Sequence, residues 1–166
     1  EGRRNLTKLR QLVRGALAEM RTMLFELRPV ALEHAELESL LRQLADALTG
    51  RTRIPVTIEV AGQADPPAEV KVACYRITQE AFNNIAKHAA AEHASLRLSQ
   101  SSASIGLEIS DDGRGFTPEA VAADRMGLAI MRERAAGIGA EIDVQSRPGG
   151  GTQLHLTWVR TAETSE

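Results

Sequence analysis

The chain has 166 residues, of which 43% are apolar, 25% charged and 3% aromatic, and its formal net charge is −2. This length allows one compact domain with an appendage, and the near-neutral charge excludes a basic field for binding nucleic acid or an anionic membrane. The lone cysteine, Cys74, excludes an intramolecular disulfide and a cysteine zinc site, and it fits a reducing, cytoplasmic compartment.

Residues 5–28 are predicted to form a long amphipathic helix that ends before Pro29. Its apolar stripe needs partner helices, because one helix cannot bury it alone. The first heptad position holds Leu6, Val13, Met20 and Leu27. No apolar run is long enough to cross a bilayer, and the chain begins without Met. We therefore expect an excised fragment that makes no membrane contact itself, and any membrane anchor of the parent protein would lie upstream.

The middle of the chain alternates between helices and strands. A second amphipathic helix is predicted over 36–49, with Gly50 as its C-cap. Alternating or continuous apolar patterns then predict a strand over 54–60, a helix over 68–89, and two strands over 94–100 and 104–110.

The last third of the chain begins with a Gly-, Asp- and Pro-rich loop over 111–126. A helix over 127–138 and a hairpin of strands 140–146 and 152–160 are predicted to follow it. In the last strand Leu154, Leu156 and Trp158 alternate with polar residues, among them His155. The element order predicts an α+β fold, a two-layer α/β sandwich with a mixed sheet covered by helices on one face.

The 68–89 helix carries the first group of candidate functional residues. Glu80, Asn84 and Lys87 or His88 are spaced to share one helix face. A carboxylate, an amide oxygen and a cation in this order suit a magnesium–triphosphate, because Mg²⁺ prefers oxygen ligands and keeps several waters. The alternative is a polar helix face in solvent.

Three glycine-containing motifs follow. Asp111 precedes Gly113 and Gly115 at the end of a strand, where glycines allow close backbone approach to a ligand. Gly127 and Leu128 open a predicted helix, and free amides at a helix N-terminus bind phosphate. Three glycines lead into Thr152. Taken singly, each motif also fits an ordinary turn or a helix start that only packs.

The four motifs in this order resemble the Bergerat-type ATP-binding fold shared by histidine kinases, DNA gyrase, heat-shock chaperones and mismatch-repair ATPases. The resemblance covers residues 35–160. Within that superfamily, residues 76–89 and 127–134 look like the sensor kinases that respond to nitrate, oxygen and membrane fluidity. Residues 24–29, Leu-Phe-Glu-Leu-Arg-Pro, are similar to the end of that subfamily's dimerisation hairpin. The implied division is 1–30 as the second helix of an incomplete dimerisation and phosphotransfer hairpin, 31–160 as the ATP-binding catalytic domain, and 161–166 as a tail.

The resemblance also implies a role for each candidate residue. Asn84 would bind Mg²⁺, with Glu80 beside it positioning water or assisting proton removal. Asp111 would accept the exocyclic amine of adenine, and Thr152 would assist through a water. Glycines at the motif positions would approach the nucleotide closely, residues 112–126 would form a lid, and the remaining groups would lie near the phosphates: Lys87, His88, Gly127 and Leu128.

The implied activity is transfer of the ATP γ-phosphate to a histidine and then to the receiver domain of a response regulator, in a homodimer joined through the helical hairpin. The subfamily's acceptor is a His followed by Asp on the first hairpin helix, and none of the four histidines fits this pattern. The chain alone is therefore predicted to bind ATP without phosphorylating itself. Two alternatives remain: a serine kinase of the anti-sigma-factor type, and a non-catalytic dimerisation or partner module.

Overall fold

The structure, a computed structural model, describes residues 34–117 and 125–161 together with Val13, Ala16, Leu17, Met20 and Leu32. The described elements, in chain order, are α3 (Leu37–Thr52), β1 (Val56–Ala61), α4 (Ala68–Asn84), the π-helix η1 (Ile85–Ala89), β2 (Ala94–Gln100), β3 (Ser104–Asp111), α5 (Arg125–Gly137), β4 (Glu141–Ser146) and β5 (Thr152–Val159).

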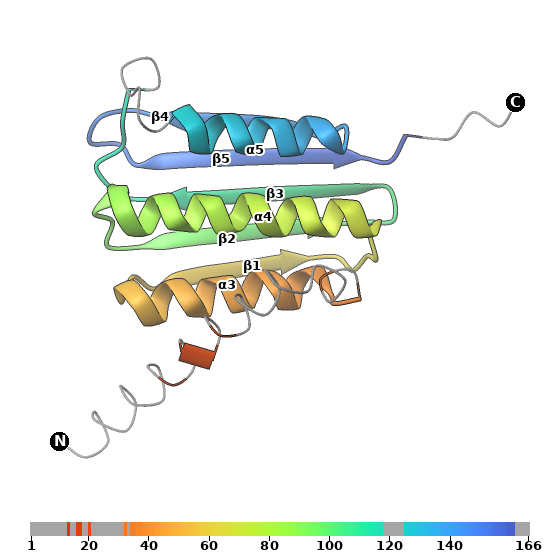
Figure 1. Ribbon diagram of the computed structural model, residues 1–166, viewed down its shortest axis with the longest axis horizontal. Coiled ribbons are helices and arrows are strands. Elements are labelled where there is room, and N and C mark those ends of the chain that lie inside the picture. The colour runs from red at the N-terminus through yellow and green to blue at the C-terminus, as the bar shows by residue number, and fades with distance from the viewer. Residues whose placement is uncertain are drawn as a thin grey trace, which may run out of the picture.

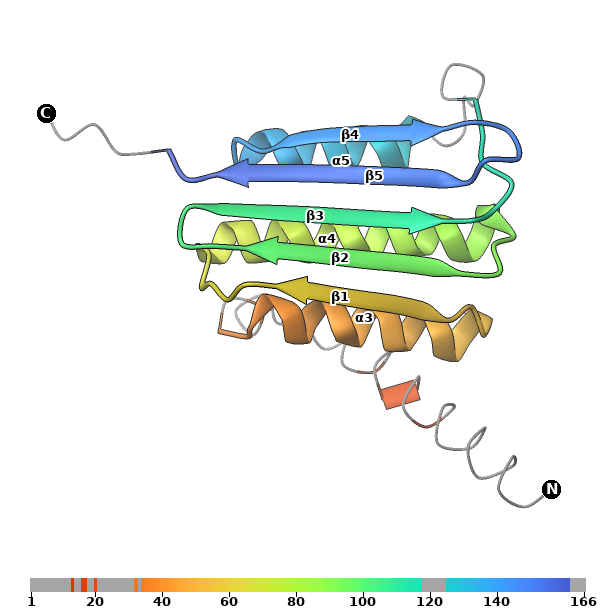
Figure 2. The ribbon, with the colours of Figure 1, turned by 180° about the vertical axis from the view of Figure 1, so that it is seen from behind.

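The five strands form one mixed sheet in the order β1-β2-β3-β5-β4. β1 and β2 are parallel because α4 and η1 cross over between them, and the other neighbouring pairs are antiparallel. Figure 1 shows α3, α4 and α5 in front of the sheet, and Figure 2 shows the opposite face of the sheet without helices. The predicted two-layer α+β sandwich is confirmed.

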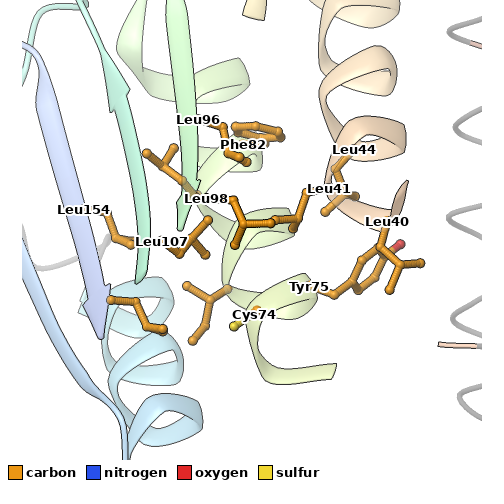
Figure 3. Close-up of a cluster of buried hydrophobic side chains, with 14 of the residues drawn as sticks. Leu40, Leu41, Leu44, Cys74, Tyr75, Phe82, Leu96, Leu98, Leu107 and Leu154 are labelled. Carbon is orange, nitrogen blue, oxygen red and sulfur yellow. The ribbon is translucent and has the colours of Figure 1, made fainter. Parts of the chain in front are cut away.

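The hydrophobic core lies between the sheet and the helices, and it is built mostly from aliphatic residues because aromatics are scarce (Figure 3). Cys74 and Tyr75 of α4 are fully buried, and Trp158 of β5 is 7% exposed, so all three belong to the core. Burial raises the pKa of the Cys74 thiol to about 12, because a thiolate loses its hydration there. The thiol is therefore a packing group.

The open face of the sheet is polar. Arg97 on β2 pairs with Glu59 on β1 at 2.9 Å and with Glu108 on β3 at 3.2 Å. His155 on β5 is the cross-strand partner of Glu108, so it lies on the same face as predicted. Leu154 and Leu156, its neighbours along the strand, are buried on the helical face.

Two predicted helix ends were wrong. α3 continues past Gly50 to Thr52, and Arg53 is the C-cap, with φ of 67° and its amide donating to the Thr49 carbonyl at 2.8 Å. The left-handed residue therefore follows Gly50 by three positions. At α5 the helix begins at Arg125, so Gly127 lies within its first turn instead of opening it.

Most of the predicted helix over 5–28, the Leu-Arg-Pro segment and residues 118–124 of the predicted lid lie outside the described residues. The four that are described, Val13, Ala16, Leu17 and Met20, are helical and exposed. No helix among the described residues is both long and apolar enough to cross a membrane.

Candidate functional site

The carboxylate of Asp111 lies at the end of β3, directly opposite Thr152 at the start of β5. Its Oδ1 accepts a hydrogen bond of 2.8 Å from the Gly113 amide. Burial raises the pKa of Asp111, with the neighbouring Asp112 charge acting the same way, while hydrogen bonds from Gly113 and Thr152 partly offset the rise. Folding has already removed part of the water around this half-buried carboxylate. It can therefore accept a strong hydrogen bond from a ligand.

A cavity of about 310 Å³ opens beside Asp111 between α4, η1, α5 and the ends of β3, β4 and β5. Its walls are mainly apolar, with a few polar groups at defined positions, as expected for a site that binds a small molecule. The lining residues are Ala81, Asn84, Ile85, His88, Ala89, Ile109, Asp111, Arg114, Gly115, Phe116, Leu128, Met131, Val144, Thr152 and Leu154.

Glycines allow neighbouring backbone segments around this cavity to pack closely against one another. A Cβ on Gly113 would lie 2.8 Å from the Ala89 Cβ and closer still to the Ala89 carbonyl. Gly115 and Gly151 adopt φ of 59° and 68°, a region that favours glycine. The Gly151 amide also donates to the Gly113 carbonyl at 3.0 Å. The segment after β3 is thus held against both the helix side and the β4–β5 turn.

The end of the predicted 68–89 helix is not α-helical. α4 stops at Asn84 and residues 85–89 form the π-helix η1, a rare conformation that is often found at functional sites. The α-helical spacing predicted for Glu80, Asn84, Lys87 and His88 therefore fails after Asn84, because each π-turn contains an additional residue. Asn84 and His88 line the cavity, whereas Lys87 is exposed and is not one of the lining residues.

Glu80, Asn84 and Gly127 meet where α4 passes the first turn of α5. A Cβ built on Gly127 would lie 2.6 Å from Glu80 Oε1 and 3.6 Å from Asn84 Nδ2. Two predicted motifs that are more than 40 residues apart in sequence are therefore in contact. A carboxylate and an amide side chain beside the first-turn backbone of α5 are suited to Mg²⁺ that is bound mainly through phosphate oxygens and waters. No group of three or more His, Cys, Asp or Glu residues within the described ranges has the arrangement of a protein-only metal site.

Comparison with known proteins identifies the family. Residues 69–162, more than half of the chain, match the family described as histidine kinase-, DNA gyrase B- and HSP90-like ATPase. The chain belongs to this family. The membership confirms the predicted relation to the ATP-binding domains of sensor histidine kinases.

Relatives of this ATPase domain include sensor kinases. It is 28% identical to the histidine-protein kinase/phosphatase DegS of Brevibacillus brevis over 164 residues, covering 98% of this chain and 42% of DegS. It is 34% identical to the sensor histidine kinase LiaS of Bacillus subtilis strain 168 over 138 residues, covering 83% of this chain and 38% of LiaS. The chain thus spans less than half of these relatives. The blue-light activated histidine kinase of Erythrobacter litoralis EL346 has a similar structure, with a TM-score of 0.61 and 26% identity over 74% of this chain and 45% of that one.

Several residues of the site in this ATPase domain were not among the predicted site residues. Arg114, Phe116 and Met131 line the cavity. Ser146, the last residue of β4, accepts from the Phe116 amide at 2.9 Å and donates to the Gly151 carbonyl at 2.8 Å. The apolar lining residues have the same types as core residues, so only their position in the fold distinguishes them. Nothing in the sequence marks Ser146.

Proposed function

We propose that this domain binds ATP with Mg²⁺ and presents the γ-phosphate to a histidine on a helix of the dimerisation hairpin, as the catalytic domain of a cytoplasmic two-component sensor kinase. The observation that carries the proposal is the single cavity in which Asp111, Asn84, His88, Leu128 and Thr152 meet, although they come from four separate motifs. Membership of the ATPase family supports the nucleotide.

In the proposed complex the half-buried Asp111 carboxylate accepts the exocyclic amine of adenine, and Thr152 assists through a water. Guanine has a carbonyl at that position, so GTP would lose a hydrogen bond and face like polarity, a penalty of about 1–3 kcal/mol. The apolar cavity walls would enclose the adenine ring. Gly113 and Gly115 would let the backbone approach the nucleotide without side-chain obstruction.

The phosphates would extend toward the contact between α4 and α5. Asn84 would hold Mg²⁺, while Glu80 would orient a water or take a proton from the attacking histidine. The first-turn amides at Gly127 and Leu128, together with His88 and Lys87, would neutralise phosphate charge. When bound, Mg²⁺ would neutralise phosphate charge, and the domain itself would contribute positioning and electrostatics.

The acceptor histidine would be provided by the hairpin, whose second helix we assign to residues 1–30. The exposed helical residues Val13, Leu17 and Met20 support this assignment, because an apolar face that is left in solvent suits packing against other helices. The hairpin would also form the homodimer. From it the phosphoryl group would pass to the receiver domain of a response regulator.

Incubation with γ-labelled ATP and Mg²⁺ tests the proposal. The present chain should remain unlabelled, whereas a longer form that carries the upstream hairpin helix should acquire an acid-labile, base-stable phosphohistidine. Label on His34, His88, His93 or His155 would contradict the assignment of the acceptor. Acid-stable label on serine in the longer form would favour the serine-kinase alternative.

A further inference from the structure

Asp112 follows the proposed adenine acceptor, Asp111, but its carboxylate binds the chain that connects η1 to β2. Its Oδ1 accepts hydrogen bonds from the backbone amides of Glu92 and His93, at 2.8 and 2.9 Å. Its Oδ2 lies 3.4 Å from Nδ1 of His93. The side chain is half exposed and does not line the nucleotide cavity, so any effect of Asp112 on the nucleotide must pass through other residues.

The bonds of Asp112 join two walls of the cavity. One wall is the end of β3 with the segment that follows it, which carries Asp111, Arg114 and Gly115. The other is η1, which carries His88 and ends at Ala89. The chain leaves η1 through Ala90, whose φ of 50° turns it sharply toward Glu92 and His93. The carboxylate therefore holds the residues immediately after that turn.

Backbone hydrogen bonds also join the segment after β3 to η1 and to the residues that follow η1. The Asp112 amide donates to the His93 carbonyl at 3.3 Å, and the Arg114 amide donates to the Ala89 carbonyl at 2.7 Å. Gly113 packs directly on Ala89. The Asp112 side chain adds two acceptor bonds to adjacent amides at this junction, and such charge-assisted bonds are stronger than neutral ones. Consistently, the amide bond from His93 is the largest of several effects that lower the pKa of Asp112.

We propose that Asp112 is a positioning residue for the nucleotide: by clamping the Glu92 and His93 amides, it fixes the separation between the η1 wall and the Asp111 wall. This inference rests on the proposed function, because it takes the cavity to be the ATP site. In this proposal the Oδ1–amide bonds hold the two walls in place, and the contact of Oδ2 with the His93 side chain adds little to nucleotide affinity.

Substitutions separate these contributions. Asp112→Asn keeps an acceptor oxygen for both amides but removes the charge that strengthens these bonds, so its affinity for Mg–ADP should fall by about threefold, less than in Asp112→Ala. Asp112→Ala removes the acceptor and should weaken Mg–ADP binding about tenfold. His93→Ala removes the ion pair alone and should leave affinity unchanged. Asp143→Ala, which deletes an exposed carboxylate of β4 opposite His155 on β5, controls for net charge.

The affinities are measured by isothermal titration calorimetry. ¹H–¹⁵N spectra follow the chemical shifts of the Glu92 and His93 amides. Both signals should move in Asp112→Ala and move less in Asp112→Asn. Wild-type affinity in Asp112→Ala, or equal weakening in Asp112→Asn and Asp112→Ala, would overturn the clamp. If Asp112→Ala does not fold, Asp112→Glu moves the carboxylate by one methylene and should fold but bind more weakly; wild-type affinity there would also overturn it. A wild-type chain that binds no nucleotide would instead refute the proposed function.

Discussion

Gly127→Ala is expected to weaken the magnesium-dependent part of nucleotide binding while stabilising the fold. The new Cβ would lie 2.6 Å from Glu80 Oε1, whereas ordinary contact begins at 3.4 Å, so the Glu80 carboxylate must move by about 0.8 Å. Asn84 Nδ2, at 3.6 Å from the same point, stays in normal contact. A displacement near 1 Å of a positioning group is large enough to disturb a site whose function depends on geometry.

We expect the affinity for Mg–ATP to fall roughly tenfold, equivalent to ~1.4 kcal/mol. Binding of ATP without Mg²⁺ should remain unchanged, because the adenine end of the cavity lies at Asp111. The free energy of unfolding should rise by up to ~1 kcal/mol, since alanine replaces glycine inside the first turn of α5. Calorimetric titrations with and without Mg²⁺, together with thermal unfolding, measure the two effects separately.

Gly137→Ala is the matched control, because it lies on the same helix and a Cβ there meets nothing within 4 Å. It should stabilise the fold without changing either affinity. Wild-type affinity for Mg–ATP in Gly127→Ala would contradict the role given to Glu80. Equal weakening of binding with and without Mg²⁺ would contradict that role as well.

Three further substitutions or reagents test the burial of particular residues. Because burial raises the pKa of Asp111, the folded chain holds that proton more tightly than the unfolded chain, so the ionised carboxylate costs stability once the pH exceeds its ordinary titration range. Asp111→Asn should therefore raise the unfolding midpoint at pH 7 and lose this advantage near pH 3; a midpoint difference that does not depend on pH would argue against it. Cys74, with a thiol pKa of about 12, should react with a disulfide reagent only on unfolding, and rapid reaction of the native chain would show that its burial is misjudged. Leu98→Ala, at a fully buried position of β2, should lower the free energy of unfolding by about 2–5 kcal/mol in a urea titration, and a loss below 1 kcal/mol would be inconsistent with that packing.

The sequence predicted the layers of the fold because their periodicities are simple. The alternation of Leu154, Leu156 and Trp158 with polar residues identified β5 and its buried face, and the leucines of residues 36–49 identified α3. The residues at which helices end were harder to predict. Gly50 has the residue type of a C-cap, yet Arg53 takes the left-handed conformation, and its amide bonds the Thr49 carbonyl after α3 has continued to Thr52.

The site could be predicted only where a residue type is distinctive. Asp111, Asn84 and the glycines follow recognisable motifs, and the fold brings Asn84 and Asp111 to one cavity. The π-turn of η1 has no comparable signal, so Lys87 or His88 was expected on the α-helical face of Glu80 and Asn84. Ser146 acts through backbone partners that come together only when the β4–β5 hairpin closes on the segment after β3.

The most direct test of the central claim is a calorimetric titration of the chain with ATP and ADP in the presence of Mg²⁺, with GTP as the competitor nucleotide and with Asp111→Asn and Asn84→Ala as variants. We predict one site per chain, binding of GTP that is about 5- to 150-fold weaker, and loss of affinity in both variants, with the loss in Asn84→Ala confined to the magnesium-dependent part. A wild-type chain that binds neither ATP nor ADP, or that binds GTP equally well, would contradict the account.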